Sequence, residues 1–444
     1  MANARSVALR ILLKIEQEQA YSNLALANAI RENRLSAVDA SFVSALVYGV
    51  LERQITLDEI IRQYSKIPLR KIELKTKIIL RMGILQLLFM DKVPDSAAVN
   101  ESVNLAKKNR LQHSAGFING ILRGITRAEV KYRLPDETDK IAYFSIRYSA
   151  PRELVKLWLD AYGESNTEQL LLHLSGRPPI CARVNTLRTD ADSLIARLAE
   201  EGVQAEKISF LSDALTLSHT GDLEKLKAFR AGLFHVQDAS SQLCVSALNP
   251  QPRDVLLDVC AAPGGKAFTA AERMQNRGKV LAFDLYEHKV RLMQSGAKRL
   301  GLDIVQASVR DAVVGLPLPQ ADRILCDVPC SGLGILSRKP EIRYKKGLTE
   351  TELPDTQYAI LCRSASYLAV GGRLVYATCT LNPRENHDVT ARFLREHPEF
   401  EGVTLQLPDG VTHAIDEQDW EIILMPHTAH TDGFYFAAFT RRSL

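Results

Sequence analysis

The feature that most constrains the fold is an alternation of short apolar runs with longer helical segments, which begins near residue 233. The clearest apolar runs cover residues 255–259, 280–283, 323–326 and 373–376. This order predicts a doubly wound parallel sheet with helices on both faces, because parallel strands must be joined by long, usually helical, crossovers. Ligands bind such sheets beyond the carboxyl ends of the strands, so a site is expected among the residues that follow these runs.

The 444 residues as a whole predict a multidomain protein. Residues 1–128 carry apolar residues at helical spacing and no strand pattern, which predicts an all-α bundle. We predict a linker at 129–150, a helix and a small α+β unit at 151–232, and the parallel-sheet domain at 233–444. The N-terminus lacks a signal-peptide pattern, and the apolar run at 78–90 is too short to cross a bilayer. We therefore expect a cytoplasmic protein without a membrane partner.

Charge is unevenly distributed along the chain. Residues 1–128 contain 19 Lys and Arg against 11 Asp and Glu, whereas residues 129–444 contain 37 against 41. The first part is thus the basic one, which favours a surface that faces nucleic acid, although a solvated helix face explains the charges equally well. The densest basic stretch consists of Lys66, Arg70, Lys71, Lys75, Lys77 and Arg81.

A turn of small residues follows the first apolar run. It reads Cys260, Ala261, Ala262, Pro263, Gly264, Gly265 and Lys266. Glycines let a backbone approach a ligand closely, and the helix that follows offers unpaired N–H groups. A phosphate-binding P-loop is one interpretation, but Cys260 replaces its first Gly and Ala267 its Ser or Thr. A plain tight turn is the other alternative.

Two acidic residues follow the next strands. Asp284 directly follows the run at 280–283, at the end of the second predicted strand, where a carboxylate can accept hydrogen bonds from ribose hydroxyls or can cap the next helix. Asp311 lies after the region of a third strand, where an adenine edge would be contacted. Alone, each residue is a weak indicator of a nucleoside site.

Two of the seven cysteines, Cys330 and Cys379, follow the runs at 323–326 and 373–376. A cysteine thiolate is available near neutral pH and is a strong nucleophile, although a lone buried cysteine is more often a small apolar residue. If the two strands are neighbours, both thiols face one crevice. Cys326 lies near Cys330, but no second Cys/His pair completes a zinc site, so we expect no metal.

Together these motifs resemble those of the Nol1/Nop2/Sun family of RNA cytosine-5 methyltransferases. The matching residues are Gln237-Asp238-Ala239-Ser240-Ser241, Cys260 to Lys266, Asp327-Val328-Pro329-Cys330-Ser331-Gly332, Thr378-Cys379 and Asp432-Gly433-Phe434. Residues 1–128 resemble the NusB antitermination fold. The resemblance implies a NusB-like RNA-binding domain, an RRM-like RNA-binding middle unit and a Rossmann-like methyltransferase domain.

The resemblance also implies S-adenosylmethionine as cofactor. Residues 260–266 would hold its methionine part, Asp284 its ribose and Asp311 its adenine. Asp327 would contact both the amino end of the cofactor and the cytosine edge. Cys379 would attack carbon 6 of the cytosine, which has left its stack, and Cys330 would assist release.

By the same resemblance, the substrate would be 16S rRNA, naked or in a partly assembled small subunit, with cytosine 967 as target. We expect a monomer. A tRNA cytosine-5 methyltransferase and a non-catalytic ribosome assembly factor are the alternatives, and the presence of both cysteines argues against the latter. DNA cytosine-5 methyltransferases attack with the cysteine of a Pro-Cys motif, which would assign that role to Cys330.

Overall fold

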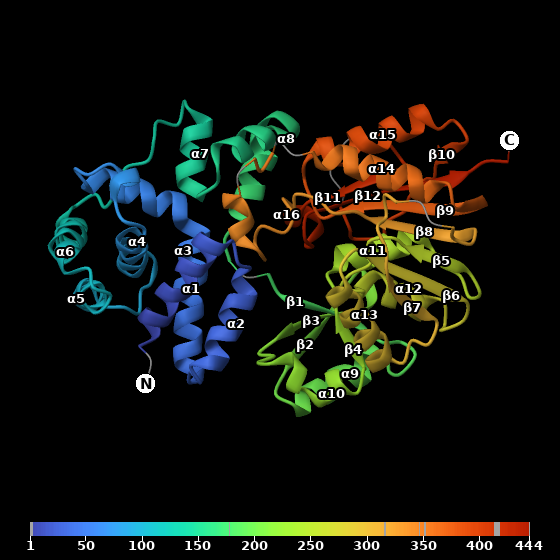
Figure 1. Cartoon of the computed structure of the whole chain (residues 1–444), viewed down its shortest axis with the longest axis horizontal. Coiled ribbons are helices and arrows are strands. Elements are labelled where there is room, and N and C mark those ends of the chain that lie inside the picture. Colours follow the sequence, from blue (N-terminus) through green and yellow to red (C-terminus); the bar gives the residue numbers. More distant parts are fainter. Residues whose placement is uncertain are drawn as a thin grey trace. The chain divides into compact units, whose positions relative to one another are not determined.

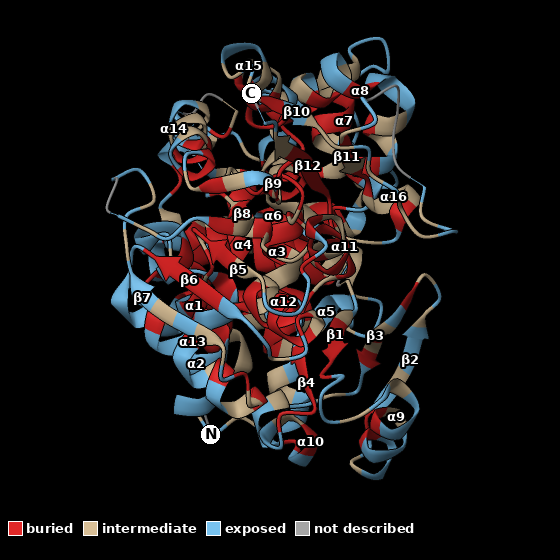
Figure 2. Cartoon of the chain, turned by 90° about the vertical axis from the view of Figure 1, so that its right-hand side faces the viewer, coloured by how far each residue is buried: buried red, intermediate tan, exposed pale blue. Residues whose placement is uncertain are grey.

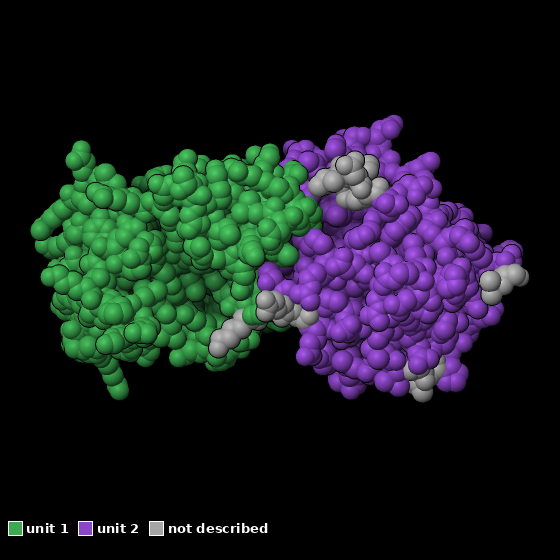
Figure 3. Space-filling view, turned by 90° about the horizontal axis from the view of Figure 1, so that it is seen from above, with its two compact units in different colours: residues 1–176, 336–348 green, residues 177–335, 349–444 purple. Residues whose placement is uncertain are grey.

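The computed structural model describes residues 3–176, 178–314, 317–345, 347–349, 352–412 and 418–443. The chain divides into two compact units, which Figure 3 colours separately. Unit 1 comprises residues 1–176 and 336–348, and unit 2 comprises residues 177–335 and 349–444. The chain therefore leaves unit 2 shortly after the Pro-Cys motif, enters unit 1 and returns, which the sequence did not predict.

Unit 1 is helical, as predicted (Figure 1). Its elements are α1 (Ala4–Glu18), α2 (Ser22–Glu32), α3 (Ala37–Tyr64), η1 (Leu69–Lys71), α4 (Leu74–Phe89), α5 (Asp95–Lys108), α6 (Gln112–Arg127), α7 (Lys140–Tyr148), α8 (Arg152–Leu172) and η3 (Pro340–Tyr344). Most of these helices share one apolar core. Helix α4 is buried on several sides, for example at Ile78, Leu80 and Ile84, because a helix that is apolar all round must be covered all round.

Two members of the basic stretch, Arg81 and Lys77, are paired with carboxylates. The Arg81 side chain is only 2% exposed, and its Nε lies 2.6 Å from Asp58 Oδ1 and its Nη1 2.8 Å from Glu16 Oε2. Lys77 Nζ lies 3.7 Å from Glu16 as well. A buried guanidinium needs such carboxylates to offset its lost hydration. Arg81 therefore links helices of unit 1, and the exposed part of the stretch is Lys66, Arg70, Lys71 and Lys75.

Residues 129–150, predicted to be a linker, contain helix α7, which packs against α3 and α8. Its Tyr143 and Phe144 are buried, and Thr56 Oγ1 donates a hydrogen bond to the Ile146 carbonyl at 2.6 Å. Two aromatic residues removed from water supply enough apolar area to hold a helix of nine residues. In the structure, this part of the chain is integrated into unit 1.

Unit 2 begins with a four-stranded antiparallel sheet in the order β2-β3-β1-β4. Its elements are β1 (Ile180–Val184), α9 (Ala191–Glu200), β2 (Gln204–Ile208), β3 (Leu211–Ser218), η2 (Leu223–Lys225), α10 (Lys227–Arg230) and β4 (Phe234–Val236). The sequence of strands and helices, βαββαβ, is the ferredoxin-like arrangement. The small α+β unit of the sequence prediction is thereby confirmed.

The larger sheet of unit 2 has the order β10-β12-β9-β8-β5-β6-β7, with β11 paired to β12. Its elements are α11 (Ala239–Leu248), β5 (Val255–Asp258), α12 (Gly265–Arg273), β6 (Lys279–Asp284), α13 (Glu287–Leu300), β7 (Val305–Val309), β8 (Ala321–Asp327), α14 (Leu353–Ala365), β9 (Leu368–Thr378), η4 (Pro383–Glu385), α15 (His387–Glu396), β10 (Phe400–Gly402), β11 (Glu421–Leu424), α16 (Pro426–Ala429) and β12 (Phe434–Arg441). Strands β5 to β9 are parallel, and β12 runs antiparallel to β9.

The parallel strands are buried in the middle of this sheet, and β7 at its edge is largely exposed (Figure 2). Two apolar clusters cover the two faces, which is why the central strands read as unbroken apolar runs. Strands β5 and β8 are neighbours although two strands intervene in the sequence, so the direction of winding switches between them. A crevice at the carboxyl ends is expected at such a switch. Within the described ranges, no helix has the length and apolarity needed to cross a membrane.

Candidate active site

The turn after β5 has no room for a side chain at Gly264. Gly264 has φ +108°, and a Cβ at this position would come within 2.4 Å of the Phe268 ring. The Gly264 carbonyl accepts a hydrogen bond from the Phe268 amide at 2.8 Å, so helix α12 starts directly after the turn. Glycine is therefore required both for the backbone angle and for space. The helix that follows directs its first N–H groups toward the carboxyl edge of the sheet.

Lys266 and Asp327 form an ion pair between the ends of β5 and β8. Lys266 Nζ lies 2.7 Å from Asp327 Oδ2, and the two side chains are 12% and 27% exposed. The ammonium also lies 5.0 Å from the centre of the Phe434 ring, in the Asp-Gly-Phe motif. Burial alone would lower the pKa of Lys266, but the Asp327 carboxylate and nearby cysteines, including Cys379, raise it. Lys266 is thus held as a cation.

The two motif cysteines meet because β8 and β9 are neighbouring parallel strands. Asp327 pairs in register with Ala377, and both chains then turn away from the sheet. Cys330 Sγ and Cys379 Sγ lie 3.2 Å apart, within hydrogen-bond distance for sulfur, and both residues are partly exposed. The two strands are therefore neighbours, as the interpretation of the sequence required, and the two thiols lie next to each other.

The surroundings of Cys330 favour its protonated form. The hydrogen bond with Cys379 and then burial raise the pKa of Cys330 well above the usual range, and the charges of Cys379 and Glu385 add to this. A thiol that keeps its proton can donate it to a neighbouring thiolate. The Lys266 cation also interacts electrostatically with Cys379.

Asp284 is the last residue of β6, and Asp311 follows the neighbouring parallel strand β7. The Arg310 amide donates to the Asp284 carbonyl at 3.0 Å, which brings the two loops together. Asp284 is nearly buried, its Oδ1 accepts the Tyr286 amide at 3.0 Å, and its Oδ2 lies 3.5 Å from Lys289 Nζ. Asp311 is exposed and accepts the Val313 amide at 2.9 Å. Both carboxylates therefore support their own turns while remaining at the carboxyl edge.

Sequence reasoning missed two residues that hold the cysteine loops. Glu385, fully buried, accepts the Ser331 amide at 2.8 Å and so fixes the loop of Cys330. Asn386 accepts from Thr378 Oγ1 at 2.6 Å and donates to the Thr380 carbonyl at 3.0 Å. These two threonines flank Cys379. A signal existed in the sequence: the run Asn382-Pro383-Arg384-Glu385-Asn386 is too polar to follow a buried strand without a role there.

The buried carboxyl of Asp258, at the end of β5, was also missed. Burial and then the nearby Asp327 charge raise its pKa to about 8, against the effect of Lys266. Neither of its carboxylate oxygens has a side-chain hydrogen-bond partner. Among the residues that the structure describes, no group of three or more His, Cys, Asp or Glu side chains is arranged to hold a metal ion.

The remaining motifs join the same region. Asp238 caps helix α11 through the Ser240 amide, and its Oδ1 also accepts the Asp432 amide at 3.1 Å. Gly433 then donates to the Gly334 carbonyl at 2.9 Å, and Gly334 donates to the Cys379 carbonyl at 3.0 Å. Hydrogen bonds thus connect segments as far apart in the sequence as Asp238 and Asp432 to the loop of Cys379.

Comparison with protein families assigns each part of the chain. A family described as 16S rRNA methyltransferase RsmB/F matches residues 245–440. The NusB family matches residues 2–127, and a ferredoxin-like domain of RsmF/B-like methyltransferases matches residues 150–224. These matches confirm the three predicted folds.

Curated relatives are similar over the full length. The chain is 38% identical to the probable ribosomal RNA small subunit methyltransferase B of Bacillus subtilis, with 99% of both chains covered. It is 36% identical to the probable ribosomal RNA small subunit methyltransferase B of Synechocystis, with 98% of this chain and 99% of the relative covered.

Solved structures show the same fold at lower identity. The crystal structure of PH0851 has a TM-score of 0.83 at 24% identity, and 99% of both chains is covered. NSun6 from Pyrococcus horikoshii, crystallised with SFG, has a TM-score of 0.59 at 22% identity, with 66% of this chain and 99% of that chain covered. On the sequence relatives and the family matches, the chain belongs to the ribosomal RNA small subunit methyltransferase B family and is an S-adenosylmethionine-dependent rRNA methyltransferase.

Proposed function

We propose that this enzyme methylates carbon 5 of a cytosine in 16S rRNA through a covalent adduct between Cys379 and carbon 6 of the base. The observation that carries the proposal is the pair of thiols 3.2 Å apart at the ends of β8 and β9. A single nucleophile needs no second thiol, whereas addition followed by elimination needs one group to attack and another to manage protons.

The Cys379 thiolate adds to carbon 6, and the electron pair of the 5,6 double bond then becomes available at carbon 5. Carbon 5 is then the nucleophile toward an electrophilic methyl group. S-adenosylmethionine, when bound, would supply that methyl group, and the electron pair of the broken carbon–sulfur bond would stay on its sulfur, which leaves as a neutral thioether. The proton of carbon 5 leaves to a base, the double bond reforms, and Cys379 departs as thiolate. Cys330 is placed to hydrogen-bond that departing sulfur, which stabilises it as a leaving group.

Lys266 and Asp327 are placed to serve both the thiolate and the base. The Lys266 cation stabilises negative charge on Cys379, and Asp327 can accept a hydrogen bond from the exocyclic amino group of cytosine. Because these side chains already pair at 2.7 Å, their orientation is set before the substrate binds.

The residues at the carboxyl edge fit the cofactor. Residues Cys260 to Lys266 form a turn whose backbone at Gly264 requires glycine, and helix α12 starts directly after it. The free N–H groups of this helix start suit the methionine end of the cofactor. Asp284 is suited to the ribose hydroxyls and Asp311, on the adjacent loop, to the adenine amino group. Asp327 would complete the contacts at the amino end.

The 16S rRNA target rests on the names of the relatives and not on a feature of the site. We propose cytosine 967 of 16S rRNA, in naked or partly assembled RNA, with the basic helical domain as a contributor to affinity. The described residues of the site would accommodate a cytosine of tRNA as well as one of 16S rRNA.

Two measurements test the proposal. Bisulfite mapping of 16S rRNA and mass spectrometry of tRNA nucleosides, from strains with and without the gene, identify the substrate. A modification confined to tRNA would contradict the 16S assignment.

Denaturing gels of the purified variants test the mechanism. Cys330→Ala should transfer the methyl group and then accumulate as a covalent protein–RNA adduct, whereas Cys379→Ala should form no adduct and transfer no methyl. If Cys379→Ala accumulates on RNA while Cys330→Ala is inert, the two roles are exchanged. Full activity in both variants would exclude the covalent mechanism.

A further inference from the structure

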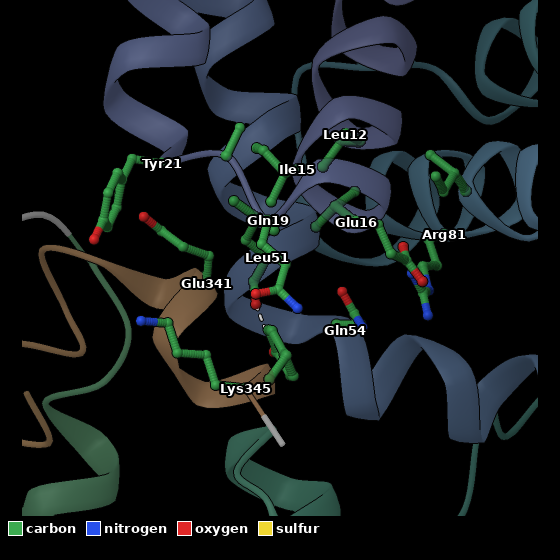
Figure 4. Close-up of a pocket in the computed structure, with 14 residues that line it drawn as sticks. Leu12, Ile15, Glu16, Gln19, Tyr21, Leu51, Gln54, Arg81, Glu341 and Lys345 are labelled. Atoms are coloured by element: carbon green, nitrogen blue, oxygen red, sulfur yellow. Dashed lines mark hydrogen bonds and ion pairs between the residues drawn. The ribbon is translucent and has the colours of Figure 1, made fainter. Parts of the chain in front are cut away.

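A cavity of about 380 Å³ lies in unit 1, between helices α1, α3 and α4 and the short helix η3 (Figure 4). Its buried cation, Arg81, is paired with two carboxylates, and Glu341 accepts two hydrogen bonds from Ser22. These charged groups already have partners within the protein. A buried polar group that the protein leaves without a partner is a better indicator of a functional contact. Unit 2 contains such a group beside the turn at 260–266.

That group is the side-chain amide of Gln237, which directly follows β4 and is 6% exposed. The Gln237 backbone amide donates to the Cys181 carbonyl at 3.0 Å, which extends the pairing of β4 with β1. Its Oε1 accepts a hydrogen bond from Thr269 Oγ1 at 2.6 Å, but its Nε2 has no acceptor among the described residues. An unsatisfied buried donor is unfavourable, so the position of this amide requires another explanation.

The explanation lies in the first turn of α12. Thr269 is fully buried one helical turn after Gly265, and its Oγ1 lies 3.1 Å from the Gly265 carbonyl oxygen as well as contacting Gln237. The Gln237 amide also packs directly on Gly265, since a Cβ added there would lie 3.6 Å from Gln237 Nε2. Gln237 therefore contacts the first turn of α12 at both of its ends.

A second contact with the same turn comes from His235, in β4. The His235 ring lies edge-on to the Phe268 ring, with 5.8 Å between the ring centres. Phe268 is the side chain that leaves no room for a Cβ at Gly264. His235 Nε2 also lies 3.4 Å from Thr269 Oγ1. Strand β4 thus contacts two successive residues of α12, Phe268 and Thr269.

An ion pair joins the sheet to the following turn of α12. Arg183 Nε, in β1, lies 3.2 Å from Glu272 Oε2, and both side chains are buried. Breaking a buried pair leaves an uncompensated charge, so this contact strongly opposes separation of α12 from the sheet. Arg183 and His235 are partners in register, so they lie on the same face of the sheet, opposite the core that α9 and α10 cover. At β1 and β4 this face is occupied by α12 and does not offer bases a stacking surface.

The next step rests on the proposed function, in which residues 260–266 hold the methionine part of the cofactor. We propose that the ferredoxin-like sheet supports this turn, and that Gln237 and Thr269 are positioning residues that hold the start of α12 before S-adenosylmethionine binds. A turn that is already ordered does not need to be ordered on binding. The contact should therefore increase the affinity for the cofactor and leave the chemical step unchanged.

The test compares Thr269→Val with Thr269→Ser in the full-length enzyme. Valine has the shape of threonine without the hydroxyl group, whereas serine keeps the hydroxyl group. In isothermal calorimetry, Thr269→Val should bind S-adenosylmethionine about three- to tenfold more weakly, as expected for one lost hydrogen bond, and Thr269→Ser should stay within about twofold of wild type.

Two further measurements separate positioning from stability. At saturating RNA and S-adenosylmethionine, the single-turnover rate of Thr269→Val should equal that of wild type, and its RNA affinity should also be unchanged. A general loss of folded structure would reduce cofactor affinity, RNA affinity and rate together. Loss of cofactor affinity alone is therefore specific to the turn.

Gln237→Met tests the same contact from β4, and it provides the test if Thr269→Val does not fold. It should weaken cofactor binding by a similar factor. The double variant should bind no more weakly than either single variant, because the two residues share one hydrogen bond. Losses that multiply in the double variant would show that the residues act separately, which would contradict the proposal.

Wild-type cofactor affinity in folded Thr269→Val or Gln237→Met would overturn the proposal, and so would equal losses in Thr269→Val and Thr269→Ser. Gly264→Ala distinguishes this failure from failure of the proposed function, because it alters the turn itself. If Gly264→Ala binds the cofactor normally, residues 260–266 are not the cofactor site and both proposals fail. If Gly264→Ala alone loses binding, the cofactor site is retained and only its support by the sheet is wrong.

Discussion

At the scale of single residues, the site separates two chemically identical side chains by their surroundings. Cys330 and Cys379 share a hydrogen bond, yet the pKa of Cys330 is raised by it while Cys379 interacts with the Lys266 cation. The same principle divides the acids: Asp327 pairs with Lys266, whereas Asp258 is buried and its pKa is raised to about 8. Roles follow from environment and not from residue type.

The first prediction concerns the pH dependence of Cys330. The largest cause of its raised pKa is the hydrogen bond with Cys379, so Cys379→Ala should lower that pKa. Iodoacetamide labelling of Cys330, followed by mass spectrometry, should therefore rise at lower pH in the variant than in wild type. Cys362, whose pKa is raised by burial, is an internal control that should not change. An unchanged Cys330 profile would show that the two thiols do not interact.

The second prediction concerns Asp284. If it accepts hydrogen bonds from both ribose hydroxyls, Asp284→Ala should weaken S-adenosylmethionine binding by about 1.5–3 kcal/mol, the cost of losing charge-assisted hydrogen bonds. Isothermal calorimetry measures this directly. Asp284→Asn, which keeps an acceptor but no charge, should lose less. Equal affinity in Asp284→Ala and wild type would remove Asp284 from the cofactor site.

At the scale of elements, the strand ends and turns determine where these side chains can act. The pairing of β8 with β9 brings the cysteine loops together, and η4 with the start of α15 supplies Glu385 and Asn386, which hold both loops. The turn between β5 and α12 depends on Gly264, since any side chain would meet Phe268. Each element thus presents one part of the site from a rigid support.

The third prediction tests that turn. Gly264→Ala should abolish measurable S-adenosylmethionine binding, because the turn must move away from Phe268 and because φ +108° is unfavourable for alanine. Gly371→Ala is the matched control: its φ is +74°, but no atom lies within 4 Å of the added Cβ. It should cost about 1 kcal/mol of stability and leave binding intact. Similar binding in both variants would contradict the proposed use of the turn.

At the scale of the whole molecule, charge and function are divided along the chain. The first 128 residues are basic and match the NusB family, whereas the cofactor and cysteine motifs all lie in unit 2. In unit 1 the exposed cations Lys66, Arg70, Lys71 and Lys75 surround η1 and the start of α4. Such a cluster attracts phosphate backbones without reading their sequence.

The fourth prediction follows from this cluster. Replacement of these four residues by glutamine in the full-length enzyme should weaken RNA binding and reduce its dependence on salt, by up to about one unit of the log–log slope for each phosphate that is no longer neutralised. Filter binding at several salt concentrations measures both. Lys77→Gln, at an ion-paired position, should change the slope little. An unaltered slope in the quadruple variant would place the RNA-binding surface elsewhere.

The sequence by itself determined which residues end the strands and therefore which side chains lie at the functional edge. The runs at 255–259, 280–283, 323–326 and 373–376 became β5, β6, β8 and β9, because apolar periodicity and glycine turns act over a few residues. Cys330, Cys379, Asp284 and the 260–266 turn were identified in this way. A local sequence pattern is sufficient to predict strand ends and turns, because these depend on a few neighbouring residues.

Tertiary structure decided what depends on contacts between distant segments. It placed Cys330 beside Cys379, buried Arg81 among carboxylates, packed α7 into unit 1, and folded residues 336–348 away from their sequence neighbours. In each case the deciding quantity is the loss of water around a group and the partner that replaces it. No local pattern encodes that partner, since burial and ion pairing are properties of the packed chain and not of a segment.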